Sequence, residues 1–165
     1  MSEQTYTRRD LGVRQFETAL RMFIAGEDRA SVITLAGAAD TILTEVLRRE
    51  HGDTFTDHLI RVYESGPGKE TPSFGSVTTR IHKMMRINHL KHFDKNDPPT
   101  IDADLDACAL GALAKAVAAV YALGNRPDLC EAFKQWVIAN ENHPSLVQAR
   151  ADVKARPKAT RWPAE

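Results

Sequence analysis

Hydrophobic residues recur along this chain at intervals of three and four positions, and almost nowhere at two. This spacing places apolar side chains on one face of a helix, whereas a half-buried strand needs strict alternation. We therefore predict an all-α chain that forms an antiparallel bundle of about six helices. The expected helices cover approximately residues 11–26, 28–51, 54–63, 73–93, 102–123 and 128–140, and a short amphipathic stretch follows Pro144.

Local signals support two of these helices. Asp28 is a good N-cap for the second helix, and Gly52 can adopt the left-handed conformation that ends it. We expect the first two helices to form an antiparallel hairpin. Segment 102–123 is rich in alanine and apolar nearly all round, which predicts the central and most buried helix.

The helix expected at 73–93 ends where Pro98 and Pro99 enter the chain. Its apolar stripe runs through Phe74, Val77, Ile81 and Met84 and continues at Asn88. His92 follows Asn88 by one turn, so both side chains are predicted to face inward. We expect Asn88 to be mostly buried and bonded to main chain, and His92 to be at least half buried beside the loop 94–100.

Composition and charge narrow the class of protein. A chain of 165 residues suits one domain, which we place at 1–149, followed by a basic C-terminal tail at 150–165. The 22 Lys and Arg residues balance the 22 Asp and Glu residues, so nothing draws the whole chain toward nucleic acid or an acidic membrane. A solvated terminus is the simpler interpretation of the basic tail, and contact with phosphates is the alternative.

Cysteine content and the hydropathy pattern bear on location. Cys108 and Cys130 lie among apolar neighbours without CxxC spacing, as expected of two buried thiols in a reducing compartment. No apolar h-region follows Met1, and no apolar run approaches the ~20 residues that span a bilayer. We therefore expect a cytoplasmic protein without a membrane partner.

Candidate chemistry is concentrated in the segment 86–92, which contains Arg86, Asn88, His89, Lys91 and His92. A histidine of near-neutral pKa can move a proton, and an arginine can hold a phosphate through two hydrogen bonds. The structural alternative is that Asn88 and His92 only tie the following loop to the bundle.

Other polar groups give weaker signals. Gly66, Gly68 and Lys69 lack the spacing of a Walker motif, so a plain surface loop is expected there. His89 and His92 have no accompanying Glu-x-x-His or HExxH pattern, and neither a metal nor a cofactor is predicted. Asp40 lies at the edge of an apolar face, where a helix-to-helix hydrogen bond is a better explanation than general acid catalysis.

Three features resemble small bacterial proteins of the HEPN type over about residues 10–140. They are LAGAAD at 35–40, NHLKHFDKNDP at 88–98, and the alanine-rich helix that follows. The resemblance implies a compact helical bundle that pairs into a homodimer. RNases of this family carry an Arg-x4-6-His motif, which Arg86 and His92 match with five intervening residues.

This match departs from the family pattern at one position. Ile87 stands where a polar residue often follows the arginine. Arg86 and His92, six residues apart, would also point about 120° away from each other on a regular helix. A kink near Leu90 or a partner subunit would be needed to bring them onto one phosphate.

Three functional hypotheses follow. The first is a non-catalytic HEPN-like binding module, homodimeric, in a defence, toxin–antitoxin or nucleotide-related system with an antitoxin or nucleotidyltransferase partner. The second is a metal-independent endoribonuclease in which Arg86 and His92 are catalytic. In either case Asn88, His89 and Lys91 are the expected binding residues, for RNA or a nucleotide. The third is a helical protein whose partner is itself or an unknown neighbour.

Overall fold

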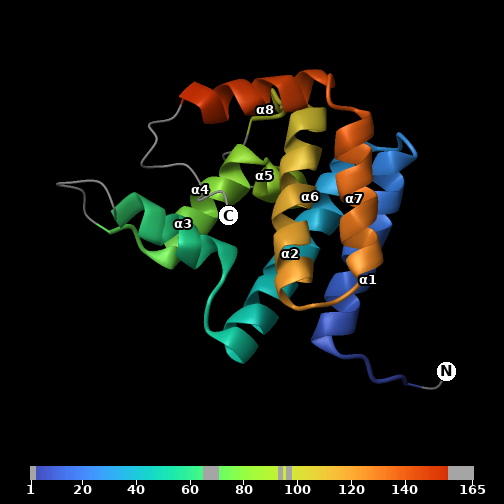
Figure 1. Cartoon of the computed structure of the whole chain (residues 1–165), viewed down its shortest axis with the longest axis vertical. Coiled ribbons are helices and arrows are strands. Elements are labelled where there is room, and N and C mark those ends of the chain that lie inside the picture. Colours follow the sequence, from blue (N-terminus) through green and yellow to red (C-terminus); the bar gives the residue numbers. More distant parts are fainter. Residues whose placement is uncertain (1–2, 65–70, 93–94, 96–97, 156–165) are drawn as a thin grey trace.

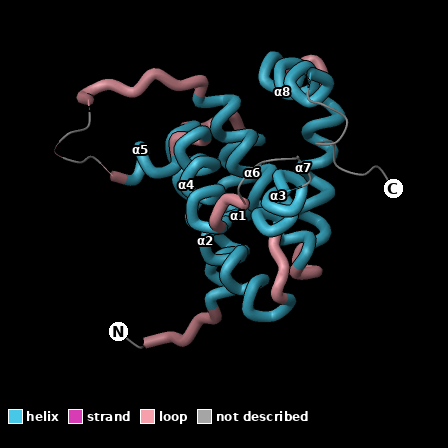
Figure 2. Tube along the Cα trace, turned by 90° about the vertical axis from the view of Figure 1, so that its left-hand side faces the viewer, coloured by secondary structure: helices cyan, strands magenta, loops and turns pink. Residues whose placement is uncertain are grey.

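A computed structural model describes residues 3–64, 71–92, 95 and 98–155 of the chain. These residues form eight α-helices and no strand, which confirms the all-α prediction (Figures 1 and 2). The helices are α1 Arg8–Ile24, α2 Arg29–His51, α3 Phe55–Glu64, α4 Phe74–Met84, α5 Ile87–Lys91, α6 Leu105–Ala122, α7 Pro127–Ala139 and α8 Pro144–Ala155. The number exceeds the six expected because one predicted helix is broken in two and the stretch after Pro144 forms a helix of its own.

Helices α1, α2, α6 and α7 form the core (Figure 1). Arg9 near the start of α1 pairs with Glu50 near the end of α2, so these two helices are antiparallel, as predicted. The Asp28 carboxylate accepts a hydrogen bond from the backbone N–H of Ser31, and Gly52 ends α2 in the left-handed region. The largest fully buried side chains of α1, α2 and α6 meet between them: Phe16, Phe23, Leu20, Ile33, Leu43, Leu113, Val32 and Val120.

Helix α6 differs from its prediction. Its alanines at 109, 112 and 116 are buried against α2, but Ala107, Ala114 and Tyr121 are exposed, and Tyr121 is 75% exposed. The helix therefore lies at the side of the core rather than at its centre. An all-round apolar sequence does not distinguish these two positions, because small residues are tolerated at the surface as well.

The expectation that no segment reaches membrane length was wrong. Helices α2 and α6 are both long and apolar enough to cross a bilayer. However, 44% of each apolar window is already buried inside the protein, where α2 packs on both α1 and α6. Core helices of soluble proteins share these features, so they are weak evidence for a membrane.

The remaining helices flank the core. α3 and α4 lie to one side, and α8 crosses the upper end of α6 (Figure 1). α8 continues across the expected boundary at 149/150 and packs Leu146 on the core. The loop containing Gly66 to Lys69 and the last residues of the basic tail lie outside the described residues.

The predicted helix 73–93 is broken near its middle. α4 is capped at Met85, and Arg86 adopts a left-handed conformation (φ 57°, ψ 13°) before α5 begins. The break rotates every later side chain, so Ile87 is buried against Gly37 while Asn88 and His92 are exposed. The predicted burial of Asn88 and His92 was therefore wrong. Met85 packs on the core in place of Met84, which is 68% exposed.

Candidate functional site

The side chain of Arg86, at the α4–α5 break, forms a hydrogen bond to the backbone. One guanidinium nitrogen, Nη2, donates a hydrogen bond to the carbonyl oxygen of Asp102 at 3.0 Å. This contact holds the exposed segment 98–104, which runs along the outside of the molecule before α6 begins (Figure 2). The predicted catalytic arginine thus has a structural contact, with further N–H donors left over.

The other predicted site residues lie on α5 or at its end. Asn88 and His92 are exposed, whereas His89 and Lys91 are half-buried. Nδ1 of His89 is buried without a hydrogen-bond partner among the described residues. No hydrogen bond or ion pair between described residues joins Arg86 to His92. The structure therefore places the five residues in one segment but does not assemble Arg86 and His92 into a pair.

A buried charge network lies beneath this segment. The Asp40 carboxylate on α2 is 2% exposed, and the Lys115 ammonium on α6, a residue 5% exposed, donates a hydrogen bond to its Oδ2. Thr44 donates to Oδ1 at 3.2 Å, and Nε2 of His82 on α4 lies 3.5 Å from Oδ2. The helix-to-helix hydrogen bond predicted for Asp40 is confirmed, and it connects three helices.

The network keeps Asp40 ionised. Burial alone would raise the pKa of Asp40, but the hydrogen bond from His82 and the charge of Lys115 outweigh burial and hold this pKa below its ordinary value. Lys91 belongs to the same environment. Burial lowers the pKa of Lys91, and the negative charge of Asp40 partly opposes that effect. One residue of the predicted site therefore lies close to the buried carboxylate.

Sequence reasoning missed Lys115 and His82, although a signal for Lys115 was present. Lys115 is the only charged residue between Ala107 and Ala122, and Asp40 is the only charged residue between Val32 and Leu43. Two lone charges of opposite sign in apolar helices indicate a buried pair, because an unpaired buried charge is costly. No comparable signal marks His82, because its inward position depends on the packing of α4.

Polar and charged side chains join α4 to α2. The guanidinium of Arg48 lies over the ring of Phe74, 3.5 Å from its centroid, and two turns along α4 His82 reaches Asp40. These two pairs show that α4 runs antiparallel to α2. No side chain of α4 is fully buried. The helix is held by specific contacts rather than by a shared apolar core.

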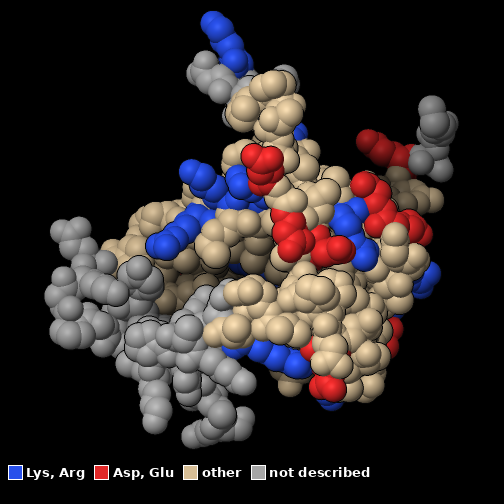
Figure 3. All heavy atoms as spheres, turned by 90° about the horizontal axis from the view of Figure 1, so that it is seen from above, with Lys and Arg blue, Asp and Glu red and all other residues tan. Residues whose placement is uncertain are grey.

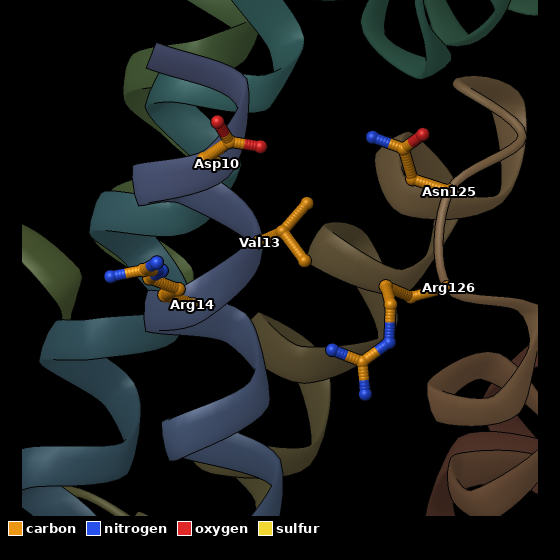
Figure 4. Close-up of a pocket in the computed structure, with 5 residues that line it drawn as sticks. All are labelled: Asp10, Val13, Arg14, Asn125 and Arg126. Atoms are coloured by element: carbon orange, nitrogen blue, oxygen red, sulfur yellow. The ribbon is translucent and has the colours of Figure 1, made fainter. Parts of the chain in front are cut away.

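A separate pocket of about 320 Å³ lies between α1 and the α6–α7 loop (Figure 4). Val13 and Asn125 point into it, whereas Arg14 points away. Arg126 has a left-handed backbone and bonds Glu17 and Asp128, so its guanidinium is occupied in tying the loop to α1. The pocket and the α4–α5 break lie toward opposite ends of α6, a helix about 27 Å long.

Neither the thiols nor the acidic groups add a second centre. Cys108 and Cys130 are free and partly buried, and burial raises the pKa of both thiols. The described residues contain no group of three or more His, Cys, Asp or Glu side chains that could hold a metal ion.

Basic and acidic side chains lie beside one another on the face seen from above (Figure 3).

Comparison with protein-family models, with curated proteins and with solved structures found no match to this chain.

Proposed function

We propose that this protein is a HEPN-like helical interaction module that forms a homodimer through the outer face of α6. The observation that carries the proposal is the composition of that face. It has no charged side chain, since Lys115 turns inward. Its exposed residues are Ala107, Ala114, Tyr121 and Ala122, and Ala118 is half-buried.

An exposed apolar helix face of this length favours association. No helix passes in front of the middle of α6 (Figure 1). Small residues occupy that middle, whereas Tyr121 stands at one end and the exposed Leu105 and Met84 stand near the other. An antiparallel two-fold pairing sets Tyr121 of each copy against the far end of its partner. Such a contact is self-complementary, as a closed dimer requires.

Light scattering tests the dimer directly. The parent should have twice the chain mass of 18.3 kDa at micromolar concentration. Ala114→Glu should give monomers, because the charge would be buried in the contact without a partner. Ala132→Glu, at an exposed alanine of α7, is the matched control and should remain dimeric. A monomeric parent would overturn the proposal.

A metal-independent endoribonuclease is the second candidate. It is favoured by the concentration of Arg86, His89, Lys91 and His92 in one segment that contains no acidic residue. RNA or a nucleotide would be the ligand, and an antitoxin or nucleotidyltransferase the partner, in the cytoplasm. Arg86→Ala and His92→Ala should each abolish RNA cleavage without changing the circular dichroism spectrum, and a chelator should have no effect. Full activity of His92→Ala would exclude the role of that histidine.

A further inference from the structure

The two ring nitrogens of His82 have different surroundings. Its Nε2 faces the Asp40 carboxylate at 3.5 Å, which is long for a hydrogen bond, as is common for catalytic contacts without substrate. Nδ1 has no hydrogen-bond partner among the described residues. The side chain is 12% exposed. Part of the side chain therefore remains accessible to solvent.

Asp40 is itself held in place. Lys115 and Thr44 bond its two oxygens from α6 and from the next turn of α2. A carboxylate fixed in this way can hold an imidazole in one orientation and stabilise its protonated form. His89 and His92 have no carboxylate partner among the described residues. Of the three histidines in α4, α5 and the α5 C-cap, only His82 has the support that acid–base chemistry needs.

The charges around this histidine favour an anionic ligand. Lys115 of α6 neutralises Asp40 of α2, and Lys91 of α5 lies near the same carboxylate and adds a second cation. The hydroxyl of Thr78, one turn before His82 on α4, is buried without a partner among the described residues. The site thus has positive charge in excess and an unused polar group.

We propose that His82, oriented by Asp40, is the acid–base residue of this protein and acts on an RNA phosphodiester held by Lys91. The proposal rests on the endoribonuclease candidate and replaces His92 by His82 as the catalytic histidine, so His92→Ala should then still cleave RNA. In the reaction, Nδ1 of His82 accepts the proton of a ribose 2′-hydroxyl, and the 2′-oxygen forms a bond to phosphorus. The bond from phosphorus to the 5′-oxygen breaks, and the proton returns through water to that oxygen. A 2′,3′-cyclic phosphate and a 5′-hydroxyl result, and no co-reactant is consumed.

The test uses the full chain with a fluorescently labelled single-stranded RNA of mixed sequence in the presence of a chelator. His82→Gln should lower the cleavage rate by about 100-fold or more, the usual contribution of general acid–base catalysis. The glutamine amide can still donate to Asp40, so the fold should be kept, and thermal melting checks this. His51→Gln, at an exposed histidine that ends α2, is the matched control and should cleave at the parent rate.

Asp40 is a positioning residue in this scheme and needs its own readout. Asp40→Asn combined with Lys115→Met removes both buried charges, so neither is left unpaired. This variant should lower kcat and leave KM unchanged, because an unoriented imidazole affects the transition state and not RNA binding. A change in KM with kcat unchanged would indicate a purely structural role for Asp40 and would contradict the assignment.

Binding is measured separately with the same RNA carrying 2′-O-methyl groups, which cannot react. Cleavage by the parent and by His82→Gln at equal rates would overturn the role of His82 and leave the endoribonuclease candidate standing. Binding without cleavage by the parent would overturn catalysis by His82 and leave a binding module. Neither binding nor cleavage would overturn both the assignment and the endoribonuclease candidate.

Discussion

The four core helices and the arm formed by α3, α4 and α5 are held together by different forces. In the core, α1, α2 and α6 bury large apolar side chains such as Phe16, Phe23 and Leu113. Among the described side chains of the arm, only Ile87 and Thr56 are fully buried, and α4 buries none of its residues. It meets the core through a ring-stacked arginine, a histidine–carboxylate contact and Ile87 against Gly37.

This difference assigns separate tasks to the two regions. Apolar burial is non-directional and roughly proportional to area, so it stabilises the core without specifying where any one polar group lies. Charged and polar contacts depend on geometry, and one of those that attach the arm, from His82, ends on the Asp40 carboxylate, which Lys115 and Thr44 hold from the core. The candidate chemistry therefore lies where the two kinds of contact meet.

The largest effect is expected from breaking the buried pair. Asp40→Ala would leave the ammonium of Lys115 buried without a partner and should lower the free energy of unfolding by about 3–5 kcal/mol. Urea denaturation followed by circular dichroism measures the loss. Asp40→Asn with Lys115→Met should lose far less, since replacing a whole ion pair is often nearly neutral. Equal losses in the single and double variants would show that Lys115 does not depend on Asp40.

The next largest loss of stability is expected where Ile87 of the arm packs against Gly37 of the core. Ile87→Ala removes a fully buried side chain and should cost about 2–4 kcal/mol. Gly37→Ala should cost about 1–3 kcal/mol, because the new methyl group would lie 2.5 Å from Cγ2 of Ile87. The two losses should not add, since the smaller residue at 87 makes room for the methyl group. A double-mutant cycle measured in urea checks this, and strict additivity would contradict the contact.

The contribution of the Asp40–Lys115 pair to the free energy of unfolding should depend on pH, and this effect is smaller. The pKa of Asp40 in the folded protein lies below its ordinary value of 3.8. A depressed pKa adds stability above the unfolded pKa, and this stability is lost as the pH falls through the folded pKa. The stability of the parent relative to Asp40→Asn with Lys115→Met should therefore decline as the pH falls from about 5 through 3.8 and below. Urea unfolding at pH 7, 5, 4 and 3 measures the difference, and a constant difference would contradict it.

The core was predictable from the sequence, and much of the arm was not. Spacing of three and four residues located α1, α2, α6 and α7, because their faces are long and apolar. The break at Arg86 left no such signal, since arginine is a good helix former and nothing nearby ends a helix. Tertiary packing of Ile87 against Gly37 accompanies the break, and it moved every later side chain from its predicted face.

The smallest expected change in stability concerns Asn88, whose exposure depends on the helix break at Arg86. On an unbroken helix Asn88 would lie in the buried stripe, and Asn88→Leu would cost on the order of 1–3 kcal/mol through stranded backbone groups. In the structure Asn88 is exposed, so Asn88→Leu should change the free energy of unfolding by no more than about 0.5 kcal/mol. Asn140→Leu is the matched control, because that amide donates to the carbonyl of Trp136 at 2.8 Å, and its loss should cost about 1 kcal/mol. Thermal melting of both variants decides between the two registers, and a larger loss at Asn88 than at Asn140 would favour the continuous helix.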